Sequence, residues 1–139
     1  QTEIIYYRYS GLQNPMQLRS EKLLPLCTRP AGYYSEDMDG DGDVEIPSTS
    51  PMVGYENAVA DEMLYMTTWS VYEDFYDLKT KYTGYYAISD GYFVTFPKRW
   101  NSSVTVKKDS DTNELVFYKY TRYKREQRGD NAYRCVFKE

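Results

Sequence analysis

Residues 84–96 read GYYAISDGYFVTF, and this stretch decides the fold class. Aromatic and β-branched residues, which favour strands, stand on both sides of Ser89-Asp90-Gly91. Because Asp-Gly tolerates the positive φ angles of tight turns, the stretch predicts a β-hairpin with strands over 84–88 and 92–96. Pro97 ends the second strand, since proline has no N–H for the ladder. We expect residues 92–96 to be an interior strand of their sheet.

Strand-like composition continues on both sides of this hairpin. The chain holds seventeen tyrosines, and pleated, half-buried surfaces favour tyrosine. Residues 16–24 favour either one short helical turn or a strand. The chain is therefore predicted to be mainly β, with antiparallel sheets, short loops and at most one or two short helical turns. The further expected strands cover residues 3–9, 63–72, 75–82, 104–107, 115–123 and 133–137.

The length of 139 residues, of which 41% are hydrophobic, is enough for one domain with a real core. Residues 48–52 form a Pro/Ser/Thr stretch that we interpret as a linker. It separates a strand segment with an acidic loop (residues 1–47) from an antiparallel β domain (residues 53–139). We expect the two parts to pack together as one unit.

Charge and missing residue types argue against several classes of protein. A net charge of −4 does not suit a nucleic-acid binder, which is normally basic. The chain has no histidine, so a Ser-His-Asp or Cys-His system cannot form within it. Glu73, Asp74 and Asp77 are the clustered carboxylates that a glycosidase would need, but nothing places two of them across a cleft.

No apolar run in the sequence approaches the roughly 20 residues that cross a bilayer. The sequence therefore predicts neither an enzyme nor a membrane-spanning segment.

An acidic loop is the one motif that carries specific chemistry. Residues 37–45 read DMDGDGDVE, and Gly40 and Gly42 permit a tight curl of the chain. Calcium takes six to eight hard oxygen ligands in a flexible cage, and alternate carboxylates in a curled loop converge on one point. We therefore predict a structural calcium site. Its candidate ligands are Asp37, Asp39, Asp41, Asp43 and Glu45.

Two loop templates compete for this motif. An EF-hand loop requires a glutamate at its twelfth position and flanking helices, but that position is Ser48 and Ile46-Pro47 is poor helix material. A loop that closes at Glu45 and leaves as a strand fits better. Asp43 would then contribute a backbone carbonyl or its side chain, and Val44 would point the other way and pin the loop to the core. The alternative is a solvated acidic turn that binds nothing.

Residues 37–47 resemble the calcium loop of FG-GAP-type repeats, the blade units of integrin-like β-propellers. Glu45 departs from that pattern, which has aspartate there. Residues 91–106, with the segment from Pro97 to Trp100, are similar to a module in uncharacterised secreted lipoproteins of Gram-positive bacteria. The resemblance covers roughly residues 33–120. It implies a calcium-bound, propeller-like protein that is secreted or anchored at the cell surface, and it implies no activity.

These observations together predict a non-catalytic, extracytoplasmic, calcium-stabilised β domain. It would serve in surface adhesion, as a scaffold or in interaction with a protein or glycan partner. The alternative is a carbohydrate-binding module in which exposed tyrosines and Trp69 or Trp100 stack on sugars, and a glycosidase fragment is the third possibility. Cys27 and Cys135 either pair in an oxidising compartment or stay as two thiols.

Overall fold

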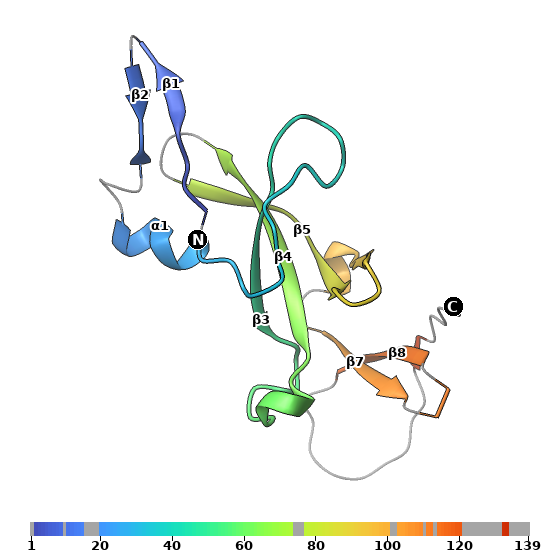
Figure 1. The fold of residues 1–139 in the computed structure, drawn as a ribbon. Coiled ribbons are helices and arrows are strands. Elements are labelled where there is room, and N and C mark those ends of the chain that lie inside the picture. The colour runs from blue at the N-terminus through green and yellow to red at the C-terminus, as the bar shows by residue number, and fades with distance from the viewer. Residues whose placement is uncertain are drawn as a thin grey trace. The chain divides into compact units, whose positions relative to one another are not determined.

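The computed structural model of this chain describes residues 2–9, 11–15, 20–73, 77–100, 103–109, 111–112, 114–120 and 132–133 (Figure 1). The described part is mainly β with antiparallel sheets, which confirms the predicted fold class. No helix in these ranges is long and apolar enough to span a membrane. The strands are β1 (Tyr6–Arg8), β2 (Gly11–Gln13), β3 (Ile46–Pro51), β4 (Tyr65–Glu73), β5 (Asp77–Ala87), β6 (Tyr92–Thr95), β7 (Val104–Asp109), β8 (Glu114–Lys119) and β9 (Ala132–Tyr133). The helix α1 spans Ser20–Leu26, and two 3-10 turns span Ala60–Glu62 and Lys98–Trp100.

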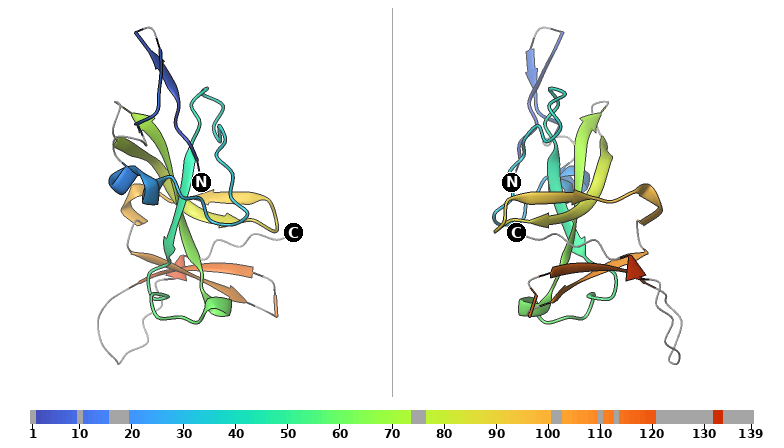
Figure 2. Two further views of the ribbon diagram at one scale, coloured as in Figure 1. Left: turned by 60° about the vertical axis from the view of Figure 1, so that its left-hand side comes forward. Right: turned by 90° about the vertical axis from the view of Figure 1, so that its right-hand side faces the viewer.

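The chain divides into two compact units, each made of two segments. The first unit comprises residues 1–50 and 67–95, and the second comprises residues 51–66 and 96–139. The first unit contains the hairpin β1-β2, the helix α1 and most of a four-stranded sheet of order β3-β4-β5-β6. The second unit contains the sheet β7-β8-β9, whose β7–β8 hairpin is drawn in orange in both views of Figure 2.

The predicted hairpin over residues 84–96 is present. Strand β5 pairs antiparallel with β6, and Ala87 lies opposite Tyr92 at the turn. The Ala87 carbonyl accepts the N–H groups of Asp90 and Gly91 at 3.2 and 2.8 Å, and Gly91 has the positive φ of 69° that the turn requires. The interior position expected for residues 92–96 is wrong, because β6 is the edge strand of its sheet. Aromatic residues in a strand indicate that one face of the strand is buried. They do not indicate whether the strand has hydrogen-bonded neighbour strands on one side or on both.

Strand β5 is longer than predicted and continues through Gly84, where two separate strands were expected. Gly84 pairs with Thr67 of β4 and with Thr95 of β6. A Cβ atom at residue 84 would lie 2.0 Å from the Val94 carbonyl oxygen, so glycine is what permits β6 to approach this closely.

The linker predicted at residues 48–52 is also wrong, because residues 48–51 belong to β3. Strand β3 is an edge strand, and edges tolerate proline because one row of backbone groups has no partner strand there. Pro47 and Pro51 are therefore compatible with this strand. The packing of residues 1–47 and 53–139 as one unit stays a prediction.

Helix α1 supplies part of the core of the first unit. Of the two alternatives for residues 16–24, the helix is the one observed from Ser20 onward, and it continues through Pro25. Leu23, Cys27 and Ile46 form a buried cluster against which Ile4 and Leu78 pack. Burial, followed by the negative charge of Glu3, raises the pKa of the Cys27 thiol. Cys135 lies outside the described residues, so its pairing with Cys27 stays a prediction.

Candidate metal site

The acidic loop is closed at its base by backbone hydrogen bonds. Glu36 and Glu45 form an antiparallel bridge, in which each N–H donates to the other carbonyl at 3.2 and 3.0 Å. Gly40 and Gly42 have φ angles of 76° and 95°, which glycine adopts without the strain that a side chain would bring. The curl predicted from these two glycines is therefore present.

The carboxylate of Asp37 organises the interior of the loop. It accepts the N–H groups of Gly40, Asp41 and Gly42 at 2.7, 3.2 and 2.9 Å, using both of its oxygens. A carboxylate has about four acceptor sites, so three such bonds leave capacity for a further ligand. The backbone thus holds Asp37 in place while one side of its carboxylate stays available.

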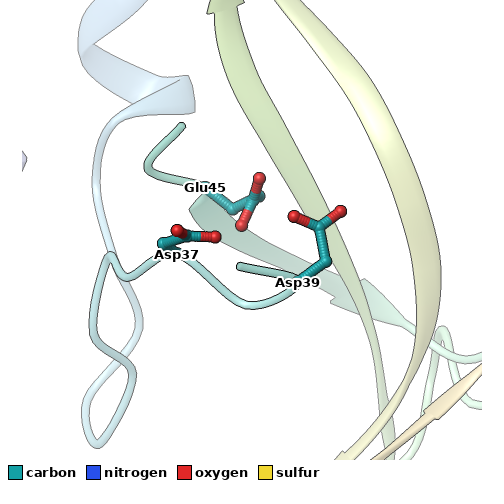
Figure 3. A group of neighbouring side chains, drawn as sticks. All are labelled: Asp37, Asp39 and Glu45. Carbon is teal, nitrogen blue, oxygen red and sulfur yellow. The ribbon is translucent and has the colours of Figure 1, made fainter. Parts of the chain in front are cut away.

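Glu45 is the buried member of the group, with an exposed fraction of 0%. Its Oε2 accepts the Met38 N–H at 2.8 Å. One carboxylate oxygen each from Asp37, Asp39 and Glu45 lies within 4.8 Å of the others. Figure 3 shows the carboxyl groups of Asp37 and Asp39 on either side of that of Glu45. Hard oxygens gathered in this way are the ligands that calcium prefers.

The other two candidate ligands lie differently. Asp41 accepts the Asp43 N–H at 3.0 Å. Its carboxylate also contacts a lysine, described below, that it shares with members of the group. The carboxylate of Asp43 is not a member of the group, and Asp43 lines a separate cavity of about 350 Å³ in the first unit. The ligand role considered for its backbone carbonyl stays a prediction. The prediction that Val44 pins the loop to the core is wrong, since its side chain is 53% exposed. Side chains alternate along an extended chain, so turning Glu45 inward turns Val44 outward.

Lys81 is the residue that sequence reasoning missed. Its ammonium lies 2.8 Å from Asp39, 2.6 Å from Asp41 and 2.8 Å from Glu45. These partners lie about forty residues earlier in the chain, so no local pattern could have identified the contact. In the pairing of β5 with β4, Trp69 lies opposite Tyr82 and Ser70 lies opposite Thr80. Lys81 therefore has no opposite residue on β4 and forms a β-bulge. Such a bulge changes the direction in which a side chain points.

The electrostatics of the loop follow from these contacts. Burial lowers the pKa of Lys81, but the hydrogen bonds that its ammonium donates to Asp39, Asp41 and Glu45 outweigh this effect and raise the pKa well above its ordinary value. The hydrogen bond from Lys81 lowers the pKa of Asp41. Burial, together with the charges of Glu45 and Asp39, raises the pKa of Tyr82 to about 12. The lysine and Asp41 are therefore both charged at neutral pH.

The carboxylates considered for a glycosidase have other partners. Glu73 forms an ion pair with Lys79 at 2.7 Å, and Asp77 forms one with Lys22. Asp74 lies outside the described residues. The two described carboxylates are therefore engaged by lysines on the exposed surface.

The two tryptophans considered for a sugar platform are packed against other rings. Trp69 has an exposed fraction of 0%, so it cannot stack on a sugar. Trp100 is half-buried, with ring centroids 5.7 Å from Phe96 and 6.4 Å from Phe117. Exposed aromatic side chains are present instead on Tyr7, Tyr9 and Tyr34.

We expect Trp100→Ala to lower the free energy of unfolding by about 2 kcal/mol, because a half-buried tryptophan loses part of the packing that a fully buried one would lose. Urea denaturation measures this change, with Tyr34→Ala as the control for loss of an exposed aromatic ring. Unchanged stability combined with loss of binding on a glycan array would instead identify Trp100 as part of a sugar platform.

Comparisons with known proteins give no relative for this chain. No family model matches it, and neither a curated protein nor a solved structure shows significant similarity.

Proposed function

We propose that this chain is a non-catalytic, calcium-binding β module that serves as an adhesion, scaffold or interaction domain outside the cytoplasm. The observation that carries the proposal is the fully buried carboxylate of Glu45, gathered with those of Asp37 and Asp39 within 4.8 Å. A buried carboxylate is costly unless a cation and hydrogen bonds compensate its charge.

The charge balance of the loop supports a metal ion. Lys81 contributes one positive charge, whereas Asp37, Asp39, Asp41 and Glu45 contribute four negative ones. Two unit charges 4 Å apart repel by about 4 kcal/mol at the effective dielectric constant of a protein surface. A divalent ion would relieve most of this repulsion, and calcium suits a loop that offers several carboxylate oxygens without rigid geometry.

A location outside the cytoplasm is consistent with a site of this kind. Calcium sites of extracellular modules have dissociation constants of about 10⁻⁴ to 10⁻³ M, which millimolar calcium occupies. Four of the five predicted ligands, Asp37, Asp39, Asp41 and Asp43, are exposed, which favours modest rather than tight binding. The partner of the module would be a protein or a glycan.

Calcium is expected to raise the melting temperature of the protein by about 5 °C at millimolar concentration relative to excess chelator. A ligand at ten times its dissociation constant adds about 1.4 kcal/mol to the free energy of unfolding, and each kcal/mol shifts the melting temperature by several degrees. Differential scanning calorimetry measures the shift, and magnesium should substitute poorly because it demands octahedral geometry.

The matched variants for this experiment are Asp39→Asn and Asp90→Asn. Asp39 belongs to the carboxylate group, whereas Asp90 lies exposed in the β5–β6 turn. The calcium shift should shrink in the first variant and persist in the second. Identical melting curves of the wild type in chelator and in calcium would refute the proposed calcium site.

A further inference from the structure

The structure already places a cation among the carboxylates of the acidic loop. The ammonium of Lys81 contacts both oxygens of Asp39, at 2.9 and 2.8 Å, and one oxygen each of Asp41 and Glu45. An ammonium has three donors, so three carboxylates use all of them. The Lys81 side chain is only 23% exposed, and one of its partners is fully buried.

The β-bulge in β5 is an independent sign that this contact is built into the fold. The pairing of β4 with β5 is regular from Glu73–Asp77 to Ser70–Thr80, and again from Trp69–Tyr82 to Thr67–Gly84. The register changes at Lys81 alone. Bulges of this kind interrupt the ladder and re-aim one side chain, and here the re-aimed side chain is the one that reaches the loop.

Lys81 and a calcium ion would require the same oxygens. Calcium binds carboxylate oxygens at about 2.3–2.6 Å, and two of the three clustered carboxylates, Asp39 and Glu45, already contact the ammonium. A divalent ion and an ammonium on the same carboxylates would repel each other strongly. The two cations are therefore mutually exclusive at Asp39 and Glu45.

We propose that Lys81 is an internal competitor for calcium, which closes the loop onto β5 when calcium is scarce and is displaced when calcium binds. This inference rests on the proposed calcium function and specifies its regulation. The carboxylates of the loop are therefore always paired with a cation, either the Lys81 ammonium or calcium. The ammonium weakens calcium binding, because the metal must first displace it. Calcium binding also releases a lysine amine from β5.

Titration calorimetry of calcium into chelator-treated protein tests the competition. Lys81→Met removes the charge and keeps most of the length of the side chain. Lys79→Met is the matched control, because Lys79 lies two residues earlier on β5 and pairs with Glu73 outside the loop. We expect calcium affinity to rise at least tenfold in Lys81→Met and to stay within twofold of the wild type in Lys79→Met.

Acetylation of surface amines, followed by mass spectrometry of peptides, supplies a readout that does not depend on affinity. Without calcium, Lys81 should react at least tenfold more slowly than Lys79, and calcium should remove most of that difference. If Lys81 reacts as fast as Lys79 without calcium, its ammonium is not held by the carboxylates of the loop, and the inference is overturned.

The outcomes separate this inference from the proposed function. Equal calcium affinity in the wild type and in Lys81→Met, or weaker affinity in the variant, overturns the competition while the calcium site stands. Binding by Lys81→Met but not by the wild type supports Lys81 as the resident cation of the loop, but it refutes both calcium binding by the native chain and the displacement of Lys81 by calcium. Absence of binding in both proteins refutes the calcium site and the competition together.

Discussion

Replacing Glu45 with alanine should lower the free energy of unfolding by about 3 kcal/mol, because it removes one partner of a buried charge pair. Glu45 is fully buried, accepts the Met38 N–H and contacts Lys81 at 2.8 Å. Its loss leaves the ammonium with exposed partners only and leaves a backbone N–H in the loop without its acceptor. Urea denaturation in excess chelator measures the change without a contribution from metal.

Asp43→Ala is the matched control for Glu45→Ala. Asp43 is an exposed carboxylate of the same loop and does not belong to the group formed by Asp37, Asp39 and Glu45. Its replacement should change stability by no more than about 0.5 kcal/mol, as exposed substitutions usually do. Equal effects of the two substitutions would show that burial of Glu45 does not hold the loop to the sheet.

Trp69→Ala should have the largest effect on stability, about 4 kcal/mol, because truncation of a fully buried tryptophan leaves a large cavity. Trp69 is completely buried in β4, and its ring meets those of Tyr86 and Phe93 edge to face, with centroids 6.1 and 6.0 Å apart. These two rings belong to the β5–β6 hairpin. The tryptophan therefore holds the hairpin to the centre of the sheet.

Trp69→Phe serves as the control for this truncation, since it keeps an aromatic ring between Tyr86 and Phe93 and should lose roughly half as much stability. Thermal and urea denaturation measure both variants. A loss below about 1 kcal/mol in Trp69→Ala would contradict the inference that Trp69 holds the β5–β6 hairpin to the sheet.

The sequence predicted those parts of the fold that depend on neighbouring residues. The turn at Ser89-Asp90-Gly91 follows from the positive φ that Gly91 adopts, and the curl of the acidic loop follows from Gly40 and Gly42. These conformations are properties of a few consecutive residues, so they can be predicted without knowledge of the rest of the chain.

The features that were missed depend on partners distant in the sequence. The edge position of β6 is set by the order of strands in the sheet, which composition does not encode. The Pro/Ser/Thr composition of residues 48–52 indicated a linker, yet an edge strand such as β3 tolerates proline because it does not need every backbone N–H. The exposure of Val44 accompanies the burial of Glu45, whose partner Lys81 lies on a strand 36 residues later in the chain.

The contacts of the candidate site show the same difference between local and distant residues. The sequence identified the loop and its carboxylates, and the structure brings Asp37, Asp39 and Glu45 together. The carboxylate of Asp43 does not belong to that group, and the carboxylate of Asp41 contacts the lysine. A lysine in a strand is an ordinary surface residue in a sequence, and only the bulge in the β4–β5 pairing gives Lys81 its role.

A crystal structure of the protein grown in millimolar calcium, with an anomalous difference map, tests the central claim most directly. We predict a peak bounded by Asp37, Asp39 and Glu45, with oxygen ligands at about 2.3–2.6 Å and the Lys81 ammonium withdrawn from Asp39 and Glu45. A map with no peak in the loop, and with Lys81 still in contact with Asp39, Asp41 and Glu45, would contradict the account.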